Sequence, residues 1–375
     1  MSASLDQIFI HAKQWLLSLL IGRAPDWIVQ IISILINVGA LLGVFLTLFA
    51  LISVLERKIL GRMQNRYGPN RVGPFGLLQP VADGIKMLIK EDIVPDRADK
   101  IVHFLAPILI AAAAILSLGV IPYGRNMTPF VIDGGILFFF AVGSATELMV
   151  FMAGWGSNNK YSMLGAMRAI AQMISYELPL IITVLPVVMI VGSLNPDRIV
   201  AAQRFYYFGF APHWFVLTPW GFTAFLLFFV SGLVESNRTP FDVPEGESEI
   251  VAGHMTEYSG FKYATFFMAE YIGMFAISGL GVTLFLGGWH APLPWLKFIP
   301  SYVWFFAKLS ILLFVYIWLR GTLTCVIAAA VWHYLGHRLA AWLWSAAVVG
   351  AVYFVLSILL ETKKKFAPRT YRFAE

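Results

Sequence analysis

The sequence of 375 residues is poor in charge and almost free of cysteine, and each shortage excludes a class of protein. Its single cysteine, Cys325, excludes a disulfide framework. It also excludes thiolate-bound iron–sulfur clusters and cysteine-rich zinc sites made by this chain alone. Charged residues make up only 13% of the chain, whereas 59% of the residues are hydrophobic. This balance is typical of a polytopic membrane protein.

The short motifs that mark nucleotide-binding and hydrolytic sites are also missing. There is no Walker A loop, no dinucleotide-binding glycine fingerprint and no nucleophile elbow. We therefore expect any redox chemistry to use cofactors held by other chains. The net charge of +6 does not indicate nucleic-acid binding, because the basic residues flank apolar runs, where they set topology. With no internal repeat, long linker or cleavable signal peptide, the sequence predicts one membrane domain, residues 1–375.

Eight apolar runs are long enough to cross a bilayer, which takes about 20 mainly apolar residues. The expected spans are Trp27–Leu55, Ile101–Pro122, Thr128–Ala153, Met163–Val191, Trp214–Ser236, Tyr263–Gly288, Tyr302–Leu323 and Tyr334–Glu361. His11 and Lys13 interrupt an earlier apolar stretch, so we expect residues 1–25 to form a helix in the membrane interface. The predicted fold class is an all-α polytopic membrane protein with eight transmembrane helices plus this N-terminal interfacial helix.

The loop 56–100 is strongly basic, which places it on the cytoplasmic or matrix side. Its nine basic residues are Arg57, Lys58, Arg62, Arg66, Arg71, Lys86, Lys90, Arg97 and Lys100. The segments Gly68-Pro69-Asn70 and Gly73-Pro74 predict sharp turns and hence a fixed shape. A fixed basic surface suits a soluble partner or a polar head group. The alternative is that these charges only set topology and contact lipid head groups.

Four carboxylates lie in or at the ends of apolar runs, where a charge is costly and usually marks a wet cavity. They are Glu147, Glu177, Glu235 and Glu270. Arg168, Gln172 and Ser175 fall on one face of the helix that carries Glu177. Pro179 and Pro186 in that helix free backbone carbonyls, which need water or neighbouring groups. A hydrated cavity accounts for this combination; the alternative is a polar stripe that joins helices.

The loop 236–262 is acidic. Its five acids are Asp242, Glu245, Glu247, Glu249 and Glu257. Pro240, Pro244 and interleaved apolar residues favour a folded loop over the alternative, a solvated charged face. In an extended segment the three alternating glutamates would point the same way and raise one another's pKa, so that they could carry protons near neutral pH. His254 lies beside these acids, but no second ligand is spaced to form a metal site with it.

Together these segments resemble a family of membrane subunits of proton-pumping NADH:quinone oxidoreductase (respiratory complex I), which link the quinone site to the membrane arm in bacteria and mitochondria. The matching stretches are Glu56–Pro80, Ala82–Glu91, Gly154–Pro179, Arg238–Gly260 and Phe261–Tyr271. The resemblance implies a quinone chamber shared with hydrophilic-arm subunits, which hold FMN and iron–sulfur clusters. Quinone would be the substrate, and this chain would hold no redox cofactor. The expected location is the bacterial plasma membrane or the mitochondrial inner membrane.

We therefore predict two sets of site residues. The set for proton coupling is Glu147, Glu177, Glu235, Glu245, Glu247, Glu249, Glu257 and Glu270. The set for the quinone chamber and arm docking is Arg57, Arg62, Arg66, Arg71, Asp83, Lys86, Arg168 and Asp242. Residues 324–338 depart from the family pattern, because its basic, acid-containing loop is missing there. Two other functions stay open: a freestanding ion or solute transporter, and the membrane anchor of a related hydrogenase.

Overall fold

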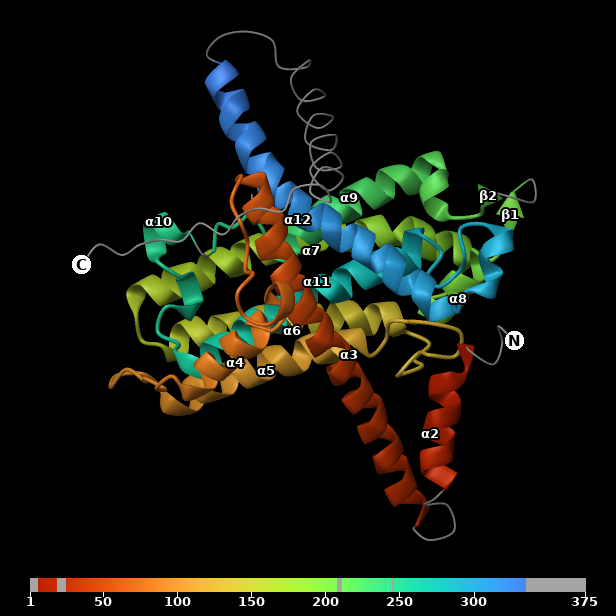
Figure 1. The fold of residues 1–375 in the computed structure, drawn as a ribbon, viewed down its shortest axis with the longest axis horizontal. Coiled ribbons are helices and arrows are strands. Elements are labelled where there is room, and N and C mark those ends of the chain that lie inside the picture. The colour runs from red at the N-terminus through yellow and green to blue at the C-terminus, as the bar shows by residue number, and fades with distance from the viewer. Residues whose placement is uncertain (1–5, 19–24, 208–210, 240, 245, 335–375) are drawn as a thin grey trace.

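The computed structural model describes residues 6–18, 25–207, 211–239, 241–244 and 246–334, and these form a bundle of long helices (Figure 1). The helices are α2 Ile8–Ser18, α3 Asp26–Met63, η1 Pro74–Gly76, α4 Gln79–Ile89, α5 Lys100–Leu118, α6 Gly135–Gly156, α7 Lys160–Val191, α8 Pro196–Ala202, η2 Phe215–Leu217, α9 Pro219–Glu235, α10 Glu247–Ile250, η3 Gly253–Met255, α11 Gly260–Phe285, η4 Pro294–Phe298 and α12 Ser301–Tyr334. Two short antiparallel strands, β1 Tyr206–Tyr207 and β2 Ala211–Pro212, pair between α8 and η2.

The predicted class, an all-α polytopic membrane protein, is confirmed. Among the described residues six helices, α3, α5, α6, α7, α11 and α12, are long and apolar enough to cross a membrane, and the apolar α9 has 17 residues. The last expected span falls almost wholly outside the described residues, so the count of eight stays a prediction. Helix α2 has 11 residues, too few to span a bilayer. It packs against α3, where Lys13 Nζ donates to Asn37 Oδ1 at 2.9 Å. Its place in the membrane interface stays a prediction.

Helix α11 forms the centre of the bundle (Figure 1). It contacts α5, α9, α12, α3 and α4, and all of its residues from Met274 to Phe285 are buried. A helix that is apolar on every side is stable only when other helices surround it or when lipid does. By contrast, only 22% of the residues in the most apolar 18-residue stretch of α3 are buried in the bundle, and the same is true of α7. The C-terminal half of α11 is therefore surrounded by protein, whereas α3 and α7 expose apolar surface.

The basic loop after α3 has the fixed shape that its glycines and prolines predict. Gly73 and Gly76 have φ of +70° and +76°, in the left-handed region that favours glycine. A Cβ on Gly76 would lie 2.2 Å from the carbonyl oxygen of Pro69, so the backbone passes too close for any side chain there. Lys58 Nζ donates to the carbonyl of Phe75 at 2.5 Å, which ties the loop to the end of α3.

Part of the acidic loop is helical, so the extended segment on which the alternation of glutamates depends is not formed there. Gly246, with φ of +32°, precedes the single helical turn α10, and η3 follows it. The condition for alternating glutamates on one face is therefore not met over 247–250, where the backbone is helical. Glu245 and the side chain of Glu247 lie outside the described residues, so their predicted roles remain untested.

Candidate functional site: a cavity lined by carboxylates

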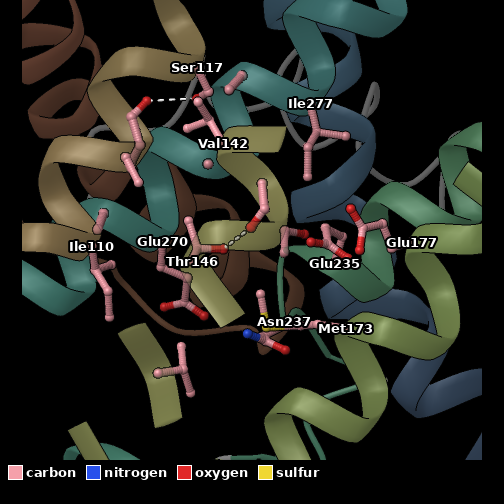
Figure 2. Close-up of a pocket in the computed structure, with 18 of the residues that line it drawn as sticks. Ile110, Ser117, Val142, Thr146, Met173, Glu177, Glu235, Asn237, Glu270 and Ile277 are labelled. Carbon is pink, nitrogen blue, oxygen red and sulfur yellow. Dashed lines mark hydrogen bonds between the residues drawn. The ribbon is translucent and has the colours of Figure 1, made fainter. Parts of the chain in front are cut away.

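A cavity of about 140 Å³ lies inside the bundle, with room for several water molecules. Its walls are formed by α5, α6, α7, α9 and α11, together with the beginning of the acidic loop and η3 (Figure 2). Most of its wall is apolar, contributed by residues such as Ile110, Phe140 and Ile277. The polar part of the wall combines acids with Ser117, Thr146, Ser236, Asn237 and His254.

Three of the four expected membrane acids line this cavity, and each comes from a different helix. Glu177 lies on α7, Glu235 ends α9 and Glu270 lies on α11 (Figure 2). Ser144 donates a hydrogen bond to Glu177 Oε1, while Glu235 Oε2 is buried without a hydrogen-bond partner among the described residues. A carboxylate facing lipid costs a few kcal/mol. Lining a cavity that can hold water avoids much of that cost.

The fourth acid, Glu147, lies on α6 immediately beside the cavity wall. It is buried at 8% exposure and interacts with Glu177 on the neighbouring helix α7. Its Oε1 atom has no hydrogen-bond partner among the described residues. Glu147 and Glu177 also lie close enough to Glu235 for their charges to act on it. The fold thus brings Glu147, Glu177 and Glu235 into one electrostatically connected group.

The polar face predicted on α7 holds the acidic loop. Gln172 Nε2 donates to the carbonyls of Phe241 at 2.8 Å and Val234 at 3.1 Å. Arg168 Nη1 lies 2.5 Å from Glu249 Oε2. Because the Arg168 and Glu249 side chains are 35% and 64% exposed, this ion pair adds at most about 1 kcal/mol. The partly buried amide of Gln172, which donates to two backbone carbonyls, is therefore the stronger anchor of the two.

The remaining acids of the loop differ in their surroundings. Glu257 accepts a hydrogen bond from Asn159, the residue that caps the start of α7, and Asp242 is half-buried. His254 in η3 lines the cavity and is buried, which lowers the pKa of its imidazole to about 4. This histidine is thus neutral near pH 7, and it contributes no positive charge to the cavity.

None of the predicted docking residues lines the cavity; Arg57 and Arg62 lie at the end of α3, and Asp83 and Lys86 lie on α4. Arg57 Nη1 donates to Asp83 Oδ2 at 2.6 Å, and Lys86 Nζ lies 3.6 Å from Asp83 Oδ1. Burial alone would raise the pKa of Asp83, but hydrogen bonds from Arg57 and Gln79 hold that pKa below its usual value. Arg62 in the last turn of α3 is exposed, and so are Arg66 and Arg71 in the loop that follows. Of the described residues of the first predicted set, only Glu177, Glu235 and Glu270 line the cavity, whereas Arg168 of the second set pairs with Glu249 of the first.

Sequence reasoning missed a buried ionic cluster beside the cavity, formed by Glu56, Arg238, Tyr271 and Arg320. Glu56 Oε2 accepts a hydrogen bond from the Tyr271 hydroxyl at 2.6 Å, and Glu56 Oε1 lies 3.4 Å from Arg238 Nη1. Arg320 donates to the same carboxylate oxygen. The Arg238 guanidinium lies 4.0 Å from the centre of the Tyr271 ring. Glu56 ends an apolar run and Arg238 follows another, so the cost of burying charge was an available signal.

An exposed apolar stripe runs along α4, beside the cluster of Arg57 and Asp83. Val81, Ile85, Leu88 and Ile89 are 51–79% exposed, and their spacing places them on one side of the helix. Phe75, in the turn that precedes α4, is 80% exposed. Helix α4 packs against α3 and α11 through its other side. The stripe is thus an uncovered apolar surface at the end of two membrane helices.

Comparison with known proteins agrees with the predicted resemblance. The profile of the NADH dehydrogenase family matches residues 36–343. Over 305 residues the chain is 47% identical to a Geobacillus sp. (strain WCH70) protein named as the H subunit of NADH-quinone oxidoreductase, covering 81% of this chain and 88% of the relative. A Paraburkholderia xenovorans (strain LB400) protein of the same name is 47% identical over 292 residues, covering 77% and 82%. The chain therefore belongs to the NADH dehydrogenase family, as an integral membrane protein.

Proposed function

We propose that this chain is the quinone-site membrane subunit of an NADH:quinone oxidoreductase and that it couples quinone reduction to proton translocation. The names of its relatives support the assignment to such a complex. The observation that carries the coupling role is the internal cavity on which Glu177, Glu235 and Glu270 converge from three helices. An apolar wall with a few convergent ionisable groups is the usual form of a functional pocket.

The chemistry of the reaction explains why carboxylates are needed. Reduction of a quinone to a quinol takes up protons as well as electrons, so groups near the head group must supply protons and recover them. Glu147, Glu177 and Glu235 influence one another's charge, so protonation of one member changes the proton affinity of the others. Water in the cavity would connect this group to Glu270 across the gap between helices. The chain thereby relays protons while the electrons stay in partner subunits.

The exposed stripe of α4 suits the approach of the quinone tail. An isoprenoid tail is apolar, and it favours a route along apolar side chains over a route through the acidic loop. Val81, Ile85 and Leu88 offer such a surface next to α3 and α11, the helix that carries Glu270. We propose that the tail lies along this face of α4 and passes between these helices. FMN and the iron–sulfur clusters would belong to the hydrophilic-arm subunits.

Arg62 tests the proposed docking role of the basic loop. Arg62→Ala should lower the amount of complex that carries the hydrophilic arm, whereas the amount of this chain in the membrane should stay unchanged. Eight other basic residues remain in the loop 56–100 to set topology, and the loop's shape is fixed. Native electrophoresis and immunoblotting measure the two quantities. Arg198→Ala, an exposed arginine of α8 at the far side of the bundle from α4 (Figure 1), is the matched control.

A normal amount of complex with the hydrophilic arm and a normal quinone reductase rate in Arg62→Ala would reject the docking role. The basic residues of the loop would then serve only to set the membrane topology.

Affinity purification through a tag on this chain separates the proposed function from the alternatives. We expect flavin- and cluster-bearing partners to co-purify, together with NADH:quinone reductase activity. A chain that transports an ion or solute by itself when purified would instead be a transporter. Nickel in the preparation without NADH oxidation would indicate the anchor of a hydrogenase.

A further inference from the structure

The buried cluster of Glu56, Arg238, Tyr271 and Arg320 joins four segments that are far apart in the sequence. Glu56 comes from α3, Tyr271 from α11, Arg320 from α12, and Arg238 from the first turn of the acidic loop. Glu56 and Arg238 are both buried, at 4% and 7% exposure. The acidic loop is therefore fixed to three helices at the point where it leaves α9.

Within the cluster, two guanidinium groups share the Glu56 carboxylate, so Glu56 balances the charge of the buried Arg238 only in part. A buried charge without a counter-ion is strongly unfavourable, so a further anion is needed nearby. Burial lowers the pKa of Arg238, but interactions with Tyr271, Glu270 and Glu56 more than offset this and raise it. Tyr271 and Glu56 already interact with each other within the cluster, so Glu270 is the further anion that can balance the charge of Arg238.

The positions of the neighbouring residues agree with this pairing. Glu270 directly precedes Tyr271 on α11, and Asn237 directly precedes Arg238; Glu270 and Asn237 both line the cavity (Figure 2). Arg238 Nε and Nη2 are buried and have no hydrogen-bond partner among the described residues. The guanidinium thus retains donors for a carboxylate or for a water that bridges to one.

We propose that Arg238 is a positioning residue, which holds Glu270 in its ionised form and makes the start of the acidic loop respond to the charge of Glu270. When Glu270 is ionised, it balances the part of the Arg238 charge that Glu56 leaves unbalanced. When Glu270 takes up a proton, Arg238 loses that balance while it remains attached to Glu56 and Tyr271. The acidic loop begins at Arg238, so this change reaches the loop directly. The inference rests on the proposed proton-coupling function and specifies how one acid of the cavity is controlled.

Other charged groups of the cavity and of the cluster also act on Glu270. Glu177 on α7 and Glu235 on α9 line the same cavity and disfavour further negative charge near Glu270, whereas the buried His254 is neutral near pH 7. Arg320 on α12 adds positive charge through Glu56. The two arginines therefore favour ionised Glu270, and the two acids oppose it. Removal of either arginine should shift Glu270 toward its protonated form.

A hydrophobic carbodiimide tests this directly, because it modifies protonated carboxyl groups. The purified complex would be treated at pH 7, and labelling of the Glu270 peptide would be measured by mass spectrometry. We expect little labelling in the wild-type complex and about tenfold more in Arg238→Gln, as is typical when a neighbouring opposite charge is lost. Arg238→Lys keeps the charge and should resemble the wild type. Arg198→Gln, on the exposed side of α8, should leave labelling unchanged.

Arg320→Gln provides the same charge change if Arg238→Gln does not assemble, and it should also raise the labelling of Glu270. Equal labelling of Glu270 in the wild type and in whichever of these two variants assembles would overturn the proposal. A merely structural role of Arg238 predicts reduced complex content with unchanged labelling per complex. The labelling result is independent of turnover. The proposed coupling function would fail separately, through normal quinone reduction and normal pumping in Glu270→Gln.

Discussion

Replacing Glu235 by glutamine should lower NADH:quinone reductase activity by about tenfold or more, because loss of a positioned acid–base group usually costs at least that much. Oxidation of NADH by a hydrophilic artificial acceptor should keep its wild-type rate, since that reaction bypasses this chain. Glutamine keeps the size and the hydrogen-bonding capacity of the side chain but cannot carry a proton. Glu235 has a buried oxygen atom that lacks a hydrogen-bond partner among the described residues, and it interacts with two further acids.

Both activities should be measured on membranes with equal complex content. Glu91→Gln is the matched control, because Glu91 is exposed and lies outside the cavity. We expect both activities of that control to equal those of the wild type. If Glu235→Gln behaves like Glu91→Gln, the cavity acid takes no part in quinone reduction.

Gly165→Ala should prevent accumulation of the assembled protein. A Cβ on Gly165 would lie 2.4 Å from the Cα of Gly253 and 2.9 Å from the backbone nitrogen of His254. Both contacts are with backbone, which cannot rotate away as a side chain would. At this junction Ser162 also donates to the carbonyl of His254 at 3.1 Å. Alanine would therefore separate α7 from η3 and open one side of the cavity, at a cost of about 1–3 kcal/mol or more.

Gly39→Ala serves as the control for this substitution, because an added Cβ at Gly39 meets no atom within 4 Å. Alanine is also the better helix former, so the control should accumulate normally. Complex content on native gels, followed by the temperature at which activity is lost, distinguishes the two variants. Normal content and normal thermal stability in Gly165→Ala would show that the tight contact between α7 and η3 is dispensable.

The membrane helices and the cavity acids could be predicted because both follow from local physical costs. An apolar run of sufficient length needs lipid or protein around it, whatever its neighbours are. A glutamate such as Glu177 or Glu270 inside such a run needs a polar environment, so the sequence indicated a cavity before any contact was known. Which helices would enclose the cavity, and which acids would meet there, depends on tertiary packing.

The cluster around Glu56 shows what local reasoning could not supply. Glu56 pairs with residues that lie 182, 215 and 264 positions away, namely Arg238, Tyr271 and Arg320. Each of these residues alone is compatible with a topogenic charge or a membrane-interface aromatic. The helical turn α10 was missed for a related reason. The left-handed backbone at Gly246 sets the path of the chain there, and the alternation of glutamates in the sequence does not indicate that conformation.

Proton translocation per quinone reduced is the most direct measure of the central claim, that the cavity acids of this chain couple the reaction to the proton gradient. It would be measured in vesicles for Glu177→Gln, Glu235→Gln and Glu270→Gln, with the Glu91→Gln control. We expect each cavity variant either to lose quinone reduction or to move fewer protons per quinone that it still reduces. Wild-type rates together with wild-type proton translocation in all three would contradict the account.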